Sequence, residues 1–459
     1  MSIEETDVVV IGMGPGGEDA AGRLAQAGLH VTGVEAKLVG GECPYWGCVP
    51  SKMMVRAASL LAEARRVPGL AGASTVNPDW EPVARRIREE ATDSWDDKVA
   101  VDRFTGKGGH FIRGRGRITG RGEVTVEAAD GPRVLRARRG ILVGTGTEPA
   151  IPPVPGLAGT PFWTNREAIE TEQVPESLIV LGGGAIGSEL AQVFARFGAR
   201  VAVVEALPRL LPAEEPEAGD LLGKVFTREG ITVRAGTRAE RVHRDGQQFS
   251  LTLASGEVLT GQRLLVATGR RARLAALGVA AYGLDETAPA IATDERMHAA
   301  DGLWAIGDIT GKGAFTHVSM YQAAIAARDI LGESGPPASY RAVPRVTFTD
   351  PEIGSVGLTE AQARERGLAV RTGTTQLPSS ARGWIHKAGN DGFIKLIEDS
   401  GRGVLVGATS AGPAGGEVLG ALAVAVHAQV PIEELRAMIY AYPTFHRAIE
   451  AALAELGRS

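Results

Sequence analysis

Two cysteines, Cys43 and Cys48, have the residue type and the spacing for redox chemistry. They are the only cysteines among the 459 residues, and four residues separate them in the segment GGECPYWGCVPSK at 40–52. A loop this short can close as a disulfide if it is coiled at the start of a helix, and Pro50 and Ser51 favour such a start. A thiolate near a helix N-terminus has a depressed pKa and is the more available nucleophile. We therefore interpret the pair as a redox centre, although packing in a core is the commonest fate of free cysteine.

A glycine-rich turn near the N-terminus predicts a dinucleotide site. The turn GMGPGG at 12–17 follows a predicted strand at 7–11 and precedes a predicted helix at 18–27, which Gly28 ends. A second predicted strand follows at 29–35. A glycine turn alone is common, but the complete strand, turn, helix and strand favour a βαβ unit that binds a dinucleotide.

Four residues of this unit have expected roles. Gly12 makes the turn, Gly14 lets the backbone approach a pyrophosphate, and Gly17 lets helix and strand pack closely. The helix N-terminus supplies free N–H groups and a dipole. Glu35 ends the second strand, where a carboxylate accepts hydrogen bonds from a ribose.

The same order of elements returns at 177–205 and predicts a second dinucleotide site. Its glycines are Gly182, Gly184 and Gly187, and Glu205 ends its second strand. A carboxylate there accepts a free 2′-hydroxyl and repels a 2′-phosphate, so we expect NADH to be preferred over NADPH. The nearby Arg209 leaves NADPH possible unless it is a solvated surface side chain. Two further glycines are expected at cofactor contacts, Gly146 and Gly269.

Two proline-containing segments are candidate domain edges. The segment IPPVPG at 151–156 disfavours both helix and sheet, and a second edge lies at 335–337. Beyond it we expect a C-terminal α+β domain, with strands at 345–348 and 392–397 and helices at 416–429 and 431–438.

Composition favours an enzyme that acts on a small molecule. The net charge is −5, 44% of the residues are hydrophobic and 22% are charged, without a basic block that would suggest nucleic acid or a membrane surface as partner. Two cysteines in all argue against a disulfide-stapled secreted protein. We find no signal-like start and no apolar stretch of about 18 residues, and we expect a cytoplasmic protein.

These motifs together resemble those of the class I pyridine nucleotide–disulfide oxidoreductases, the family of glutathione reductase, lipoamide dehydrogenase and mercuric reductase. GLWAIGDITG at 302–311 and TDPEIGSVGLTEAQA at 349–363 resemble the family's second flavin motif and the start of its dimerisation domain. The resemblance implies an α/β fold with two Rossmann-like dinucleotide-binding domains and a C-terminal α+β dimerisation domain. It implies a homodimer with an FAD domain at 1–150 and 266–335, an NAD(P)H domain at 151–265 and an interface domain at 336–459.

The resemblance also implies roles for single residues. Cys48 would be the charge-transfer thiol nearer the flavin, and Cys43 the interchange thiol that attacks substrate. Asp308 would hold the ribityl chain, unless it only caps a turn. Lys52 would lie beside the flavin N5 with Glu189 as its ion-pair partner, unless both are solvated helix residues. Electrons would then pass from NADH through FAD and the disulfide to a thiol-reactive substrate.

The chain departs from the family in the C-terminal segment that carries its proton relay. The family pattern is His-Pro-Thr-x-x-Glu, whereas residues 442–447 read YPTFHR, with Tyr442 in place of the histidine and Arg447 in place of the glutamate. A phenol with a reference pKa of about 10 cannot shuttle protons near pH 7 as an imidazole does. His446 lies one turn along, about 5–6 Å away, and substitutes only if the segment is shifted. Mercuric reductases resemble this chain in having a tyrosine nearby, but it lacks their C-terminal cysteine pair.

Three other residues near these motifs have two interpretations each. Tyr45 and Trp46 either stack on an aromatic substrate or wall the flavin, and His317 either lies near the flavin ring or is a core histidine. Three functions stay open: a reductase working through Cys43, a flavin reductase that passes electrons directly to a quinone, metal ion or oxygen, and a non-catalytic redox-sensing subunit.

Overall fold

The computed structural model describes residues 3–457, which form two compact units. The first unit comprises the chain up to Pro50 together with Arg85–Ala150 and Arg270–Ser339. The second comprises Ser51–Ala84, Ile151–Gly269 and the chain from Tyr340 onward. In the described part of the chain, no helix has both the length and the apolar character needed to cross a membrane.

The first unit is built on a mostly parallel sheet in the order β3-β2-β1-β5-β16. β4 pairs antiparallel with both β3 and β5, and β15 pairs antiparallel with β16. The strands are β1 (Ile3–Ile11), β2 (Val31–Glu35), β3 (His110–Gly120), β4 (Glu123–Ala128), β5 (Gly131–Val143), β15 (His298–Ala300) and β16 (Leu303–Ala305), with a separate pair formed by β6 (Glu148–Pro149) and β14 (Arg270–Arg271).

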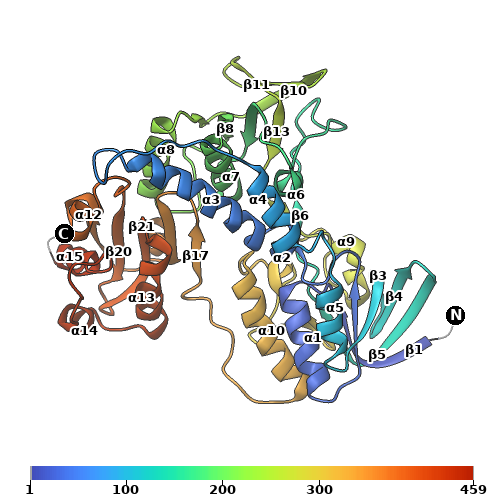
Figure 1. The fold of residues 1–459 in the computed structure, drawn as a ribbon. Helices are drawn as coiled ribbons and strands as arrows, with labels where there is room; N and C mark the ends of the chain where they lie inside the picture. The colour runs from blue at the N-terminus through green and yellow to red at the C-terminus, as the bar shows by residue number, and fades with distance from the viewer. Residues whose placement is uncertain (1–2, 458–459) are drawn as a thin grey trace. The chain divides into compact units, whose positions relative to one another are not determined.

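Two helices of the first unit, α1 (Pro15–Gln26) and α10 (Thr316–Leu331), lie side by side (Figure 1). Their close approach depends on small residues, because a Cβ at Gly16 would overlap the Ser319 hydroxyl. This contact fixes the N-terminus of α10 beside the glycine turn that opens α1. The unit also contains α2 (Glu42–Tyr45), α5 (Lys98–Thr105) and α9 (Leu274–Leu277).

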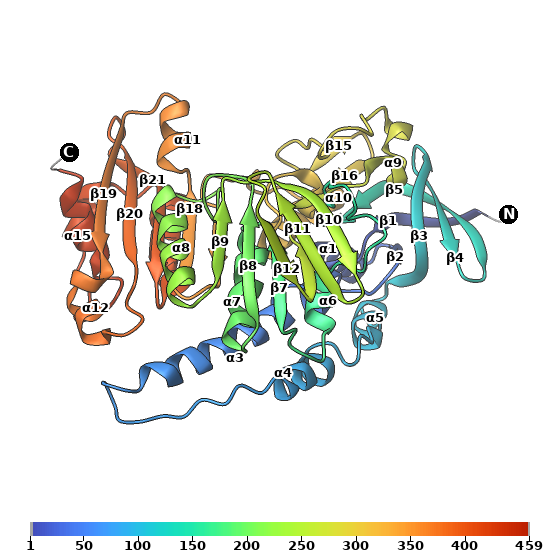
Figure 2. The same cartoon turned by 90° about the horizontal axis from the view of Figure 1, so that it is seen from above.

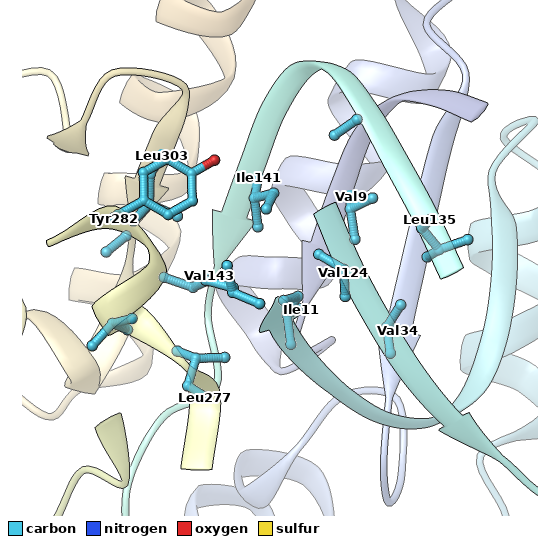
Figure 3. Packing of buried hydrophobic residues seen from close by; sticks show 14 of the residues in the cluster. Val9, Ile11, Val34, Val124, Leu135, Ile141, Val143, Leu277, Tyr282 and Leu303 are labelled. Carbon is cyan, nitrogen blue, oxygen red and sulfur yellow. The ribbon is translucent and has the colours of Figure 1, made fainter. Parts of the chain in front are cut away.

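One hydrophobic cluster of the first unit lies on one face of this sheet (Figure 3), and residues of the opposite face such as Val10 and Leu142 are buried as well. Val9 and Ile11 of β1 and Ile141 and Val143 of β5 are buried, because every second side chain of a strand points to the same face. Burial of each such side chain stabilises the fold by about 1.5–3 kcal/mol. The ends of β1 and β5, where the nucleotide turns begin, are thereby fixed.

The second unit contains a parallel sheet in the order β13-β7-β8-β9, whose last three strands run side by side in Figure 2. The strands are β7 (Ser177–Leu181), β8 (Arg200–Glu205), β9 (Thr232–Ala235) and β13 (Arg263–Val266), with helices α4 (Glu81–Arg86), α6 (Asn165–Glu170), α7 (Ala185–Arg196) and α8 (Pro216–Arg228). A small antiparallel sheet accompanies it, formed by β10 (Ala239–Asp245), β11 (Gln248–Leu253) and β12 (Val258–Gly261).

The same unit contains a five-stranded antiparallel sheet in the order β17-β18-β21-β20-β19. Its strands are β17 (Pro344–Thr347), β18 (Glu352–Gly357), β19 (Val370–Gln376), β20 (Phe393–Asp399) and β21 (Val404–Gly412). The helices are α11 (Glu360–Glu365), α12 (Ala381–His386), α13 (Gly415–Ala428), α14 (Ile432–Ala437) and α15 (Ala448–Glu455). The long helix α3 (Cys48–Arg66) belongs to this unit from Ser51 onward.

The expected fold class is confirmed, and the differences lie at element ends. Helix α1 begins at Pro15 rather than at residue 18, because proline fits the first helical position, where its missing N–H costs nothing. Gly28 follows the helix with φ of +88°, a conformation that glycine adopts without strain. The segment at 151–156 contains neither helix nor strand, as expected.

Candidate active site

Cys43 and Cys48 lie on two helices that follow each other directly. Cys43 is in the single turn α2, and Cys48 is the first residue of α3. Both are free thiols; Cys43 is half-buried and Cys48 is exposed. The expected helix start is therefore present, and it lies at Cys48 itself rather than at Pro50.

Thr316 is a neighbour of this pair that the sequence did not reveal. Its Oγ1 lies 3.5 Å from the Sγ of Cys48, and it is the first residue of α10. The sulfur of Cys48 thus lies at the N-terminus of α3 and contacts the N-terminal residue of α10. Two helix N-termini favour negative charge on this sulfur. The only sequence signal was the position of Thr316 shortly after the motif that contains Asp308.

The two thiols are linked by a hydrogen bond that affects the pKa of Cys43. The hydrogen bond to Cys48 raises the pKa of Cys43 well above its ordinary value, burial raises it further, and a hydrogen bond with Thr316 opposes the rise. The Cys43 thiol therefore holds its proton near neutral pH. Attack by Cys43 requires that this proton moves to Cys48 or to another base.

Tyr45 and Trp46 differ in how far they reach solvent. Tyr45 is buried, and burial, followed by the charge of Asp97, raises its pKa to about 12. Trp46 is half-buried and tilted against it, with ring centroids 5.9 Å apart. The burial of Tyr45 favours its interpretation as a packing wall. His317 stacks on Phe315, with ring centroids 5.2 Å apart.

The first glycine turn has the geometry of a pyrophosphate cradle. Gly12 has φ of +92°, and a Cβ there would lie 2.6 Å from the carbonyl oxygen of Gly144. A Cβ at Gly17 would overlap the carbonyl oxygen of Gly12. At Gly14, by contrast, a Cβ would meet nothing within 4 Å. Open space therefore lies over the backbone at the N-terminus of α1, which fits the pyrophosphate of a dinucleotide.

Glu35 supports this turn with both of its carboxylate oxygens. Oε2 accepts a hydrogen bond from the backbone N–H of Met13 at 2.8 Å, and Oε1 accepts one from Lys37 at 2.8 Å. Each oxygen retains a second lone pair. Glu35 can therefore hold the turn and accept a ribose hydroxyl.

The second glycine turn repeats the first in detail. Gly182 has φ of +110°, a Cβ at Gly187 would overlap the oxygen of Gly182, and a Cβ at Gly184 would meet nothing within 4 Å. Glu205 accepts hydrogen bonds from the backbone N–H groups of Gly183 at 2.7 Å and of residue 207 at 2.8 Å. Both turns therefore fit a dinucleotide.

Arg209 is half-buried, which corrects its interpretation as a solvated surface arginine. A Cβ at Gly219 of α8 would lie 3.1 Å from its Cδ. Its Nη2 lies 3.5 Å from the carbonyl oxygen of Glu214, and its Nε is buried with no partner within residues 3–457. The stem of the Arg209 side chain therefore packs against α8.

Asp308 belongs to a hydrogen-bonded chain that reaches the cysteine loop. Thr147 Oγ1 donates to Asp308 at 2.9 Å, and Arg270 donates to the Oγ1 of Thr147 at 2.9 Å and to its carbonyl oxygen at 2.6 Å. The same guanidinium lies 4.0 Å from the carboxylate of Glu42, the neighbour of Cys43. Thr147 and Arg270 were missed in the sequence, where each directly follows an expected cofactor glycine.

Those two glycines, Gly146 and Gly269, have φ of +64° and +124°. A Cβ at either would meet nothing within 4 Å, so glycine is favoured at these positions by the positive φ and not by lack of space. They shape the backbone that presents Thr147 and Arg270.

The structure brings Lys52 and Glu189 together. Lys52 Nζ lies 2.6 Å from Glu189 Oε2, and the glutamate side chain is only 7% exposed. The other oxygen, Oε1, accepts the backbone N–H of Phe348 at 2.8 Å. A buried carboxylate with both oxygens satisfied is a fixed counter-charge for the lysine.

The C-terminal segment forms a different pair from a histidine–glutamate dyad. Tyr442 is 69% exposed, and the guanidinium of Arg447 lies 5.4 Å from its ring centroid. Arg447 also donates to the carbonyl oxygen of Tyr440 at 3.1 Å and pairs with Glu450 at 3.0 Å. His446 is half-buried and tilted against the ring of Tyr440. Both sequence candidates lie in the second unit and both cysteines in the first.

Comparison with known proteins identifies the family of the chain. Residues 6–325 match the family profile described as pyridine nucleotide-disulphide oxidoreductase, and residues 343–453 match the dimerisation domain of the same family. The dihydrolipoyl dehydrogenase of Chlorobaculum tepidum is 34% identical over 97% of this chain and 96% of its own length. The mercuric reductase of Shigella flexneri is 34% identical over 97% of this chain and 80% of its own.

Solved structures agree as well. The HOCl-induced flavoprotein disulfide reductase RclA of Escherichia coli, solved as a Cu(II) complex, has a TM-score of 0.86 and 26% identity over 98% of this chain and 99% of its own. LpdA of Mycobacterium tuberculosis has a TM-score of 0.86 and 28% identity, covering 99% of both chains. With two dinucleotide turns, a cysteine pair and these matches along its length, the chain belongs to the pyridine nucleotide-disulphide oxidoreductases and is an FAD-dependent enzyme that takes electrons from NAD(P)H.

Proposed function

We propose that Cys43 and Cys48 are the redox-active disulfide of this enzyme and reduce a thiol-reactive substrate. The observation that carries the proposal is the geometry of the pair. The exposed Cys48 lies at a helix start against Thr316, and the half-buried Cys43 lies in the preceding turn, where the hydrogen bond to Cys48 raises its pKa. Such a pair has one thiol suited to hold charge and one suited to attack after deprotonation.

The residues proposed for the cofactors follow from the two turns. FAD would be held by Gly12, Gly14, Gly17 and Glu35, with Asp308 at the ribityl chain; when bound, it accepts a hydride from NAD(P)H and passes on two electrons. By the family resemblance, Lys52, paired with Glu189, would supply positive charge to the bound flavin. NAD(P)H would be held by Gly182, Gly184, Gly187 and Glu205.

NADH is the preferred electron donor in this proposal. The carboxylate of Glu205 already accepts two backbone hydrogen bonds and keeps its negative charge next to the turn. A ribose hydroxyl can donate to it, whereas a 2′-phosphate would be repelled. The stem of Arg209 packs on α8, and its Nη2 lies 3.5 Å from the carbonyl oxygen of Glu214.

The chemistry at the thiols is a two-step exchange. The Cys43 thiolate attacks one sulfur of a substrate disulfide, so that a mixed disulfide forms and the first substrate thiolate leaves. The Cys48 thiolate then attacks the Cys43 sulfur, which re-forms the Cys43–Cys48 disulfide and releases the second thiolate. Two protons are taken up by the products, and two electrons from NADH reduce the disulfide again.

We propose that the chain has an FAD domain at 1–150 and 266–335 and an NAD(P)H domain at 151–265. The remaining C-terminal part, 336–459, is proposed as the interface of a homodimer. Large apolar side chains are exposed on it, among them Ile439 at 95% and Trp384 at 75%. Water-exposed apolar groups of this size favour a partner surface. We also propose a reducing compartment, the cytoplasm, because the chain has only these two cysteines.

The second candidate function is that of a flavin reductase. Electrons would then pass directly from the flavin to a quinone, a metal ion or oxygen, and the cysteines would not be needed for this transfer. The replacement of an imidazole by Tyr442 favours it, because ordinary disulfide exchange needs a proton carrier. The relative RclA was solved with Cu(II), which makes a metal ion the first acceptor to test. A non-catalytic sensor is not proposed, because the chain belongs to a family of NAD(P)H-dependent oxidoreductases.

The variant Cys43→Ser separates these functions. For the first we expect loss of disulfide reduction with bound flavin retained, measured as NADH consumption with a disulfide, a quinone and Cu(II) as acceptors. Unchanged consumption with every acceptor would contradict the first function. Absence of NADH consumption by the unmodified enzyme would contradict both functions.

A further inference from the structure

Phe348 contacts both members of the Lys52–Glu189 pair. Its backbone N–H donates to Glu189 Oε1 at 2.8 Å. Its ring lies under the ammonium of Lys52, with Nζ 4.7 Å from the ring centroid. Phe348 follows β17 directly, in the segment that the family comparison assigns to the dimerisation domain.

The two contacts act on different parts of the pair. The backbone hydrogen bond fixes one carboxylate oxygen, so that only Oε2 faces Lys52, at 2.6 Å. The ring offers the negative face of its quadrupole to the cation, which attracts it within about 6 Å. The lysine side chain is 35% exposed, and without the ring its flexible stem has other orientations open to it.

Phe348 itself is held by helix α7. Gln192 exchanges two hydrogen bonds with the backbone of Asp350, at 2.9 and 2.8 Å. Arg196, only 5% exposed, binds the carboxylate of Asp350 at 2.8 Å. Three successive turns of one helix, carrying Glu189, Gln192 and Arg196, therefore fix the segment 348–350. The backbone from which the Phe348 ring projects is thereby fixed relative to α7.

We propose that Phe348 is a positioning residue that holds the Lys52 ammonium in place through its ring. The inference rests on the proposed function, because there Lys52 supplies charge to the bound flavin. It goes beyond that function by assigning to the start of the dimerisation domain a part in setting the charge of the redox site. A flexible ammonium would stabilise the reduced flavin less than a fixed one, since its charge would be averaged over several positions.

Competitive acetylation of lysines by acetic anhydride, followed by peptide mass spectrometry, tests the contact without turnover. In Phe348→Leu we expect Lys52 to react about two- to fivefold faster, as for the loss of one cation–π contact. Phe348→Tyr keeps a ring and should react like the unmodified enzyme, and Glu189→Gln should react faster still. An unchanged rate for Lys52 in Phe348→Leu would overturn the proposal.

Phe249→Leu is the control, because it removes a ring that faces another cation, Arg244, at 5.7 Å in the same unit, although Phe249 is fully buried and Phe348 is half-buried. A rise of equal size in this control would also overturn the proposal, since it would reflect general loosening. The flavin midpoint potential of the same proteins tests the link to function. We expect a lower potential in Phe348→Leu alone, by about 20 mV if the effect is fivefold. Faster acetylation with an unchanged potential would support the contact and refute the role of Lys52 in the proposed function.

Discussion

Thr316 Oγ1 lies 3.5 Å from the sulfur of Cys48, and each of these residues is the first of a long helix. The contact therefore joins the N-termini of α3 and α10 at one sulfur. It gives the thiolate a hydroxyl donor in addition to the backbone N–H groups of a helix start.

Replacement of Thr316 tests this contact. Thr316→Val removes the hydrogen bond that lowers the pKa of Cys43 and leaves the shape nearly unchanged. We expect the pH profile of iodoacetamide alkylation at Cys43 to move up by about one unit, the equivalent of about 1.4 kcal/mol. Thr316→Ser keeps the hydroxyl and serves as control. An unchanged pH profile of alkylation in Thr316→Val would show that the hydroxyl does not affect the pKa of the thiols.

Replacement of Cys48 tests the coupling of the two thiols from the other side. The hydrogen bond to Cys48 is the main reason that the pKa of Cys43 is raised. In Cys48→Ser this cause is weakened, so Cys43 should lose its proton, and become alkylated, at a lower pH than in the reduced unmodified enzyme. Mass spectrometry identifies the alkylated residue. Alkylation at the same or a higher pH would mean that burial alone protects Cys43.

The two carboxylates at the glycine turns give a matched pair of predictions. Glu205→Ala removes two backbone hydrogen bonds and the charge, and we expect the KM for NADH to rise about tenfold. The preference for NADH over NADPH should fall with it. Glu35→Ala should instead weaken FAD retention, measured by flavin release on ultrafiltration, while the KM for NADH stays unchanged. The reverse pattern would exchange the two proposed nucleotide sites.

The pair formed by Tyr442 and Arg447 can be converted to the family dyad. In the double variant Tyr442→His with Arg447→Glu we expect disulfide reduction to rise by on the order of 10², the usual contribution of a general acid–base. Tyr442→Phe should keep the original rate, because the phenol is not the proton carrier. A large loss of activity in Tyr442→Phe would show that the hydroxyl takes part in the reaction.

Lys395 provides a prediction on stability. Its ammonium is 5% exposed and binds Glu215, Glu217 and Glu360 at 2.7–2.9 Å. Lys395→Met would leave the buried Glu215 without its counter-charge, and we expect the free energy of unfolding to fall by about 3–5 kcal/mol. Lys98→Met removes an exposed ion pair with Asp102 and should leave the melting temperature unchanged. Equal melting temperatures of both variants would contradict the argument.

The sequence predicted those parts of the site whose geometry is local. Gly12, Gly17 and Glu35 act within one βαβ unit, where turn conformation and strand length decide their place. Thr316 and Phe348 were missed because their contacts join segments at least 159 residues apart in the chain, and no local pattern distinguishes a threonine beside a thiol from one that starts a helix.

The strands of the fold were also predictable from the sequence, because their pattern is local. Alternation of apolar residues and glycine turns located the strands to within a few residues, as at β8, which ends at Glu205 as expected. Helix ends were less predictable because capping and packing decide them together, as at Pro15 and Cys48.

Glu205 holds its turn with the same carboxylate that would choose the coenzyme. A substitution that admits a 2′-phosphate by removing this charge also releases the N–H groups of Gly183 and residue 207. A switch of coenzyme in this chain therefore takes at least two changes, one that reverses the charge and one that supports the loop again. The choice of coenzyme and the stability of the loop without coenzyme thus depend on the same side chain, Glu205.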